Sequence, residues 1–175
     1  MKLKLRFDDS KIQYWADRYV PQQTDSMNTE DLFKDKWKPL IQQRCYIDKE
    51  QLRKIAQWKS RRSSHHIEKN DDSYIREITT FSFTTNNERA KIEVLMCLNG
   101  VGWPSASTIL HFFHNAPYPL LDFRALWSIG IESYKYSFSF WEKYVDFCRN
   151  IANENEVSMR TLDRALWQYS RENQP

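Results

Sequence analysis

The sequence predicts an all-α protein, and three observations support this. The 175 residues include three glycines, where an average composition would supply about twelve. Four of the six prolines lie at or after residue 104, so long segments run without a helix breaker. Within those segments apolar residues recur at the 3.6-residue spacing of amphipathic helices, and strand-like alternation is hard to find. We expect about nine helices.

The first half of the chain predicts four of these helices. The first covers residues 11–20, and the second runs from 29 to about 46 with Pro39 as a bend or break. Asp48 is placed to cap the third helix. The fourth begins near residue 71, and its predicted inner face consists of Tyr74, Ile75, Ile78 and Phe81.

The second half predicts five further helices, over residues 88–98, 103–114, 123–129, 137–152 and 159–171. Pro117 and Pro119 force an extended connection that leads to Asp122. Gly130 stands where a left-handed residue ends a helix.

Composition limits the class of protein. A net charge of +3 is compatible with nucleic acid but too small to predict it, so the position of the charges must decide. The three cysteines, Cys45, Cys97 and Cys148, are too widely spaced for a disulfide framework or a CxxC metal pair. No apolar run is long enough to span a membrane. We therefore expect a cytoplasmic protein with no membrane partner and no obligate protein partner.

Two of the three glycines lie in the segment Leu98-Asn99-Gly100-Val101-Gly102, between two apolar helices. Glycine allows a sharp turn and a close approach of the backbone to a ligand. The helix that follows directs its N–H groups and positive dipole end out of the turn, which suits a phosphate. The alternative is an ordinary helix–helix turn with a glycine cap.

The segment from Leu98 to Ser105, followed by Asp122, resembles the helix-hairpin-helix superfamily of base-excision DNA glycosylases. In that superfamily a Leu-Pro-Gly-Val-Gly turn precedes a helix with a small residue early on, and an aspartate follows about twenty residues later. Asp122 lies twenty residues after Gly102. The close match covers residues 88–130, and Asn99 replaces the usual proline.

The resemblance implies a glycosylase-like fold of about nine helices in two lobes that share a core. We expect one domain over 1–175, with the hairpin lobe at about 48–136 and the second lobe formed by 1–47 and 137–175. DNA is the implied partner. The implied phosphate-binding residues are Leu98, Asn99, Gly100, Val101, Gly102 and Ser105. Trp103 and Pro104 are candidates for the base pocket.

The implied reaction is hydrolysis of the N-glycosidic bond of a flipped base, with the Asp122 carboxylate as the catalytic group. Bifunctional members carry a lysine two positions after the second glycine. Pro104 occupies that position here, which argues against a lyase. With a single cysteine in the C-terminal region we expect no iron-sulfur cluster, while main-chain carbonyls of the turn are candidate ligands of a monovalent cation.

Asp122 also has a structural interpretation, because it precedes the predicted helix 123–129 and is placed to cap it. Basic residues gather between Leu52 and Lys69, among them Lys59, Arg61 and Arg62. This segment either contacts the DNA backbone or is a solvated helix end. The four histidines lack further ligands at convincing spacing, so we expect no metal site.

Three functional hypotheses remain open. The first is a monofunctional DNA glycosylase, and the second is a non-catalytic nucleic-acid-binding module on the same scaffold. The third is a structural or protein-interaction role for the hairpin.

Overall fold

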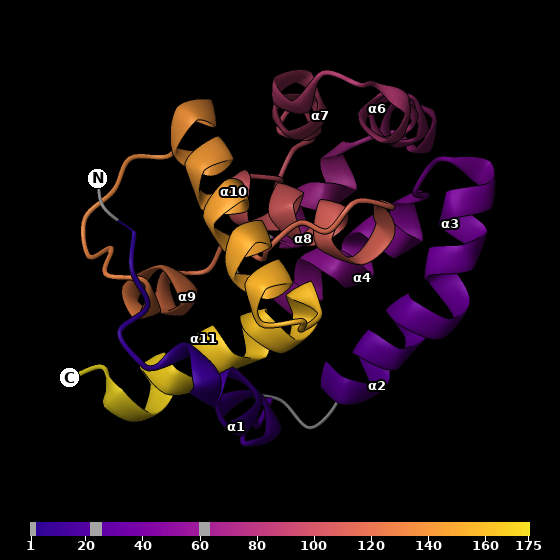
Figure 1. Ribbon diagram of the computed structural model, residues 1–175. Helices are drawn as coiled ribbons and strands as arrows, with labels where there is room; N and C mark the ends of the chain where they lie inside the picture. Colours follow the sequence, from indigo (N-terminus) through magenta and orange to yellow (C-terminus); the bar gives the residue numbers. More distant parts are fainter. Residues whose placement is uncertain (1–2, 22–25, 60–63) are drawn as a thin grey trace. The chain divides into compact units, whose positions relative to one another are not determined.

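The computed structural model describes residues 3–21, 26–59 and 64–175, which form helices joined by loops (Figure 1). No strand occurs within these ranges, so the all-α class is confirmed. None of their helices is both long and apolar enough to cross a membrane. The chain divides into two compact units, Gln22–Ala116 and the combination of Met1–Pro21 with Pro117–Pro175.

The bounds of the two units differ from those of the expected lobes. The helical segment after residue 25 belongs to the same unit as the hairpin rather than to the C-terminal helices. Its Phe33 side chain is fully buried, with ring centroids 5.2 Å from Phe112 and 5.6 Å from Phe113. These aromatic contacts explain why the segment belongs to the hairpin unit, because the segment and the helix after the hairpin share one hydrophobic core.

The unit Gln22–Ala116 is built around a helix that follows the hairpin, α8 (Trp103–Phe113). Eight of the eleven α8 residues are buried, and α3, α4 and α7 pack against it. Figure 1 shows α6 and α7 side by side. The other helices are α2 (Ser26–Asp31), η2 (Leu32–Trp37), α3 (Lys38–Arg44), α4 (Lys49–Lys59), η3 (His65–Lys69), α6 (Asp72–Thr84) and α7 (Glu88–Leu95).

Pro39 does not break its helix. The chain stays helical from α2 through α3, and the turn before the proline widens into the π-helix η2. The N–H of Lys38 donates to the carbonyl of Phe33, five residues earlier. Proline has no N–H and its ring crowds the preceding turn, so a wider turn absorbs the misfit.

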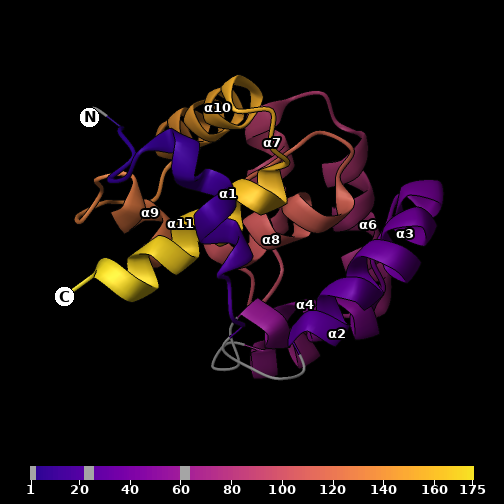
Figure 2. The ribbon, with the colours of Figure 1, turned by 60° about the horizontal axis from the view of Figure 1, so that its bottom comes forward.

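The second unit contains α1 (Ile12–Asp17), α9 (Phe123–Ser128), α10 (Phe138–Glu154) and α11 (Met159–Asn173). The short 3-10 helix η1 (Asp9–Lys11) leads into α1, and α1 lies against α11 (Figure 2). The N-terminal segment runs along the end of α9. There the Lys4 N–H donates to the Ile129 carbonyl at 3.2 Å, and the Arg6 N–H to the Ser128 carbonyl at 2.9 Å. This segment therefore satisfies carbonyls that the helix end leaves open.

Local capping follows the sequence closely. Asp48 accepts from the Gln51 N–H, and the Gln51 side chain accepts from the Asp48 N–H, which forms a capping box for α4. Gly130 has φ of 84° and ends α9, while the Ile131 N–H returns to the Leu126 carbonyl. Both caps were expected from residue type and position.

The face of α6 was predicted wrongly at two positions. Tyr74 is 41% exposed and Phe81 is 48% exposed, whereas Ile75, Thr79 and Ser82 are buried. The Thr79 and Ser82 hydroxyls donate to main-chain carbonyls, so two small polar residues fit the interior. Sequence periodicity favours the large apolar residues because it carries no information about such hydrogen bonds.

The extended connection Pro117–Asp122 is held by two buried side chains. The Tyr144 hydroxyl donates to the Leu120 carbonyl at 2.8 Å, and the Leu120 N–H donates to Asp163 Oδ1 at 3.1 Å. Burial raises the pKa of the Tyr144 phenol well above its usual value, so the hydroxyl keeps its proton. Helices α10 and α11 thus fix the backbone two residues before Asp122.

We expect Tyr144→Phe to lower the free energy of unfolding by about 1–2 kcal/mol, because the buried Leu120 carbonyl loses its donor. Urea unfolding measures the change. Tyr74→Phe is the matched control, since Tyr74 is 41% exposed and should leave stability within about 0.5 kcal/mol. Equal effects of the two variants would contradict the role of the Tyr144 hydroxyl.

Candidate functional site

The segment 98–102 forms a tight turn between α7 and α8. Gly100 adopts a left-handed φ of 83°, and the Val101 N–H donates to the Leu98 carbonyl at 3.0 Å. Gly102 is extended and is the N-cap of α8, whose Ala106 N–H donates to the Gly102 carbonyl at 2.9 Å. The glycine is required at position 100, where a side chain would strain the backbone.

The turn separates an apolar inner side from a polar outer side. Leu98 is 1% exposed and Val101 is 7% exposed, while Asn99 and Gly102 are exposed. Within the described part of the chain, the Gly100 N–H and the Gly102 N–H make no hydrogen bond. The first turn of α8 has neither a side-chain cap nor an acidic residue. These donors and the positive end of the helix suit an anion.

Asn70 holds the turn from behind. Its side chain is buried, with 2% exposure, and its Oδ1 accepts from the Asn99 N–H at 2.8 Å and from Asn99 Nδ2 at 3.1 Å. Its Nδ2 donates to the Asn99 carbonyl and to the Ile67 carbonyl, both at 3.0 Å. One amide therefore fixes the two peptide units on either side of the Asn99 Cα and joins them to the end of η3.

The sequence analysis did not identify Asn70 as part of the site. The only signal in the sequence is an asparagine directly before a predicted helix start, and this pattern indicates a cap or loop residue. Its actual partner lies twenty-nine residues away, and only the packing of η3 beside the hairpin brings the two together.

Three carbonyls of the turn, those of Leu98, Asn99 and Gly102, accept hydrogen bonds within the unit. The Leu98 carbonyl accepts from the Val101 N–H, and the Asn99 carbonyl faces the Nδ2 donor of Asn70. A carbonyl oxygen has two lone pairs, so these hydrogen bonds leave the expected monovalent cation a prediction.

The start of α8 places the other candidate hairpin residues. Ser105 is buried, whereas Trp103 and Pro104 are half-buried. The Pro104 carbonyl accepts from the Ser107 hydroxyl at 2.8 Å and from the Thr108 hydroxyl at 2.9 Å. These two bonds stiffen the first turns of the helix. Trp103 and Pro104 belong to one unit and Asp122 to the other, so a shared base pocket remains a prediction.

The basic segment is only partly described. Lys59 is half-buried at the last residue of α4, and Arg61 and Arg62 lie outside the described residues. Glu68 of η3 is 3.5 Å from Lys49 Nζ and 3.8 Å from Arg53. Part of the expected positive charge is therefore balanced locally, at exposed sites where such pairs contribute little to stability.

Asp122 caps α9. Its Oδ1 accepts from the Arg124 N–H at 3.0 Å, as the structural interpretation of this residue requires. The pKa of Tyr136 is raised mainly by burial of the phenol, then by its interactions with Tyr134, and to a smaller extent by the negative charge of Asp122. The carboxylate therefore stands beside a tyrosine cluster that sequence reasoning did not include. The two tyrosine rings lie 5.1 Å apart.

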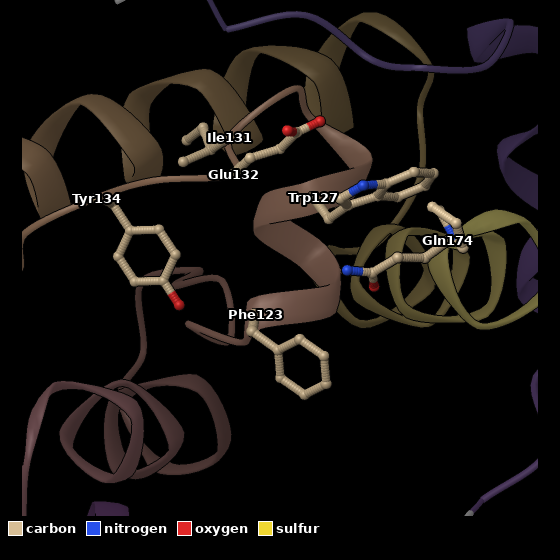
Figure 3. Close-up of a pocket in the computed structure, with 7 residues that line it drawn as sticks. Phe123, Trp127, Ile131, Glu132, Tyr134 and Gln174 are labelled. Carbon is tan, nitrogen blue, oxygen red and sulfur yellow. The ribbon is translucent and has the colours of Figure 1, made fainter.

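A cavity of about 310 Å³ opens beside α9 (Figure 3). Figure 3 shows Phe123 and Trp127 projecting from α9 and Tyr134 from the loop after it. The cavity is lined by Phe123, Trp127, Ile131, Glu132, Tyr134, Gln174 and Pro175, and thus not by Asp122. The Arg6 guanidinium lies 4.3 Å from the ring centroid of Trp127 and forms an ion pair with Glu132. Two residues that line the cavity therefore already have a cationic partner.

The histidines form no metal group within the described part of the chain. The rings of His65 and His66 lie 3.9 Å apart on η3. His114, the C-cap of α8, accepts a hydrogen bond from the Ala116 N–H through Nδ1. This bond holds the chain after α8 against the end of the helix.

Comparisons with known proteins found no match to a family model, to a curated protein or to a solved structure.

We expect Asn70→Ala to lower the free energy of unfolding by about 1–3 kcal/mol and to speed amide hydrogen exchange at Asn99, because the turn loses its buried partner. Urea unfolding and exchange measured by NMR give the two quantities. Asn153→Ala is the control, since this asparagine is exposed on α10. Unchanged exchange at Asn99 would show that the amide does not hold the turn.

Proposed function

We propose that this protein binds DNA through the hairpin formed by residues 98–102. The observation that carries the proposal is the pair of N–H groups at Gly100 and Gly102, which have no acceptor among the described residues and precede an uncapped helix. A phosphate oxygen is an acceptor of the right charge for both donors and for the helix dipole.

The surroundings of the turn support the same interpretation. Gly102 is exposed, so the sugar-phosphate backbone can approach without meeting a side chain. Asn70 keeps the turn in one conformation, and preorganised donors bind an anion without an ordering cost. Main-chain donors contact phosphates whatever the bases, so we expect affinity with little sequence preference and with strong dependence on salt.

Gly102→Asp tests this assignment sharply. Aspartate is a favoured N-cap residue. The backbone of Gly102 has φ of −110°, which any residue can adopt, and a Cβ at this position would lie 4.0 Å from Pro104 Cδ, so a side chain fits. We expect unchanged or higher thermal stability, because the new carboxylate can accept from the Ser105 N–H in the first turn of α8. DNA binding should weaken about 10-fold to 100-fold, because the same carboxylate repels a phosphate at the Gly100 and Gly102 N–H groups. Fluorescence anisotropy with a labelled duplex measures Kd.

The control is Asn87→Asp, which adds the same charge at the N-cap of α7 in the same unit. It should leave Kd within about 2-fold, the range expected of a distant surface charge at moderate salt. If both variants weaken binding equally, net charge rather than the hairpin determines affinity. If Gly102→Asp leaves Kd unchanged, the hairpin is not the phosphate site.

A second function, hydrolysis of an N-glycosidic bond, is favoured by the position of Asp122. This carboxylate is half-buried at the N-terminus of α9, and two buried side chains fix the backbone just before it. In the proposed reaction the bond from C1′ of the sugar to the base breaks and the base leaves with the electron pair. The carboxylate stabilises the positive charge on the sugar, water then forms the new C1′–O bond, and the proton that this water loses passes to the departed base.

Asp122→Asn separates the structural and chemical roles, because asparagine is an equally good N-cap. We expect the folded state and DNA affinity to persist and base release from damaged duplexes to fall about 100-fold or more. Asp146→Asn, an exposed change on α10, is the control. Absence of base release by the unmodified protein on every lesion would exclude the hydrolysis proposal and leave the binding proposal standing.

A further inference from the structure

Helix η3 carries a cluster of basic side chains that the hairpin does not use. His65 and Lys69 are exposed and His66 is half-buried, and the two imidazole rings lie 3.9 Å apart. Ile67, between them in sequence, is fully buried and anchors the helix to its unit. The buried isoleucine therefore presents the basic side chains from a fixed support.

The same helix is joined to the hairpin. Asn70 directly follows η3 and bonds to both the N–H and the carbonyl of Asn99, next to Gly100. A 3-10 helix rises about 2.0 Å per residue, which places His66 about 8 Å from Asn70 along its axis. That length is close to two steps of about 3.4 Å, the rise per phosphate of one strand along the axis of a DNA duplex.

Charge around the cluster favours an anion. The pKa of His66 is lowered, first by the charge of His65, then by burial, and also by Lys69. Glu68 is the carboxylate of η3, and it already lies near both Lys49 and Arg53 of α4. The charged residues of η3 and of α4, which packs against it, are Lys49, Glu50, Arg53, Lys54, Lys59, Glu68 and Lys69.

We propose that His65, His66 and Lys69 bind a second phosphate of the DNA strand held at the hairpin, two steps along that strand from the hairpin phosphate, and that this binding takes up a proton. This inference rests on the proposed function of the hairpin and extends its site to η3. The ligand is a phosphodiester, whose negative charge relieves the repulsion between two adjacent imidazoles and a lysine.

The sign of the pH dependence follows from that repulsion. The phosphate favours protonated His66, so its pKa is higher in the complex than in the free protein. The extra affinity is fully present below the free-state pKa and is lost as pH rises through the pKa of the complex. For an imidazole this window lies at about pH 5–8.

The test compares Kd for a short labelled duplex at about pH 5.5 and about pH 8, at equal ionic strength. For a pKa rise of about one unit, the unmodified protein should bind about 10-fold more tightly at the lower pH. The double variant His65→Gln/His66→Gln should lose most of this ratio and retain its affinity at the higher pH. His111→Gln on α8 is the control, and circular dichroism checks the fold of each variant.

The outcomes separate the two proposals. If the double variant keeps the pH ratio of the unmodified protein, the η3 site is wrong and the hairpin proposal stands. If His111→Gln abolishes the ratio instead, the proton is taken up elsewhere and the η3 site is likewise wrong. If the unmodified protein binds no duplex at either pH, the hairpin proposal itself fails and the η3 site fails with it.

Discussion

The buried amide of Asn70 is the interaction on which the candidate site depends. It satisfies the N–H and the carbonyl of Asn99 from one side, so the peptide before Gly100 has a single orientation. A turn with two glycines would otherwise have more backbone freedom than any other part of the chain. The hydrogen bonds of one side chain thus convert a flexible segment into a rigid one, and rigidity is what main-chain anion sites require.

The burial of α8 explains why the exposed part of the site is the turn. Most of this helix is enclosed by α3, α4 and α7, and its small residues near the start allow close packing. A helix enclosed along its length can meet a ligand only at an end. The N-terminal end of α8 has an exposed glycine as its N-cap and no side-chain cap, and the proposed function places a phosphate at the donors left there.

Asp122 has an observed structural role as the cap of α9 and a second, chemical role in the proposed hydrolysis. The cap of α9 needs an oxygen at that position, and the hydrogen bonds of Tyr144 and Asp163 to Leu120 hold the backbone that delivers it. A carboxylate fixed in this way is suited to electrostatic stabilisation of a developing cation, which depends on groups that need no reorganisation. Asparagine would serve the cap equally well, so the cap alone does not explain the charge.

The sequence by itself determined the helical class, the caps at Asp48, Asp122 and Gly130, and the turn at the two glycines. These features depend on neighbours within about six residues, and local backbone chemistry specifies them. Tertiary structure decided the partnership of Asn70 with Asn99 and the exposure of Tyr74 and Phe81. Each of these depends on which distant surface arrives beside a residue, and residue spacing along the chain does not encode that.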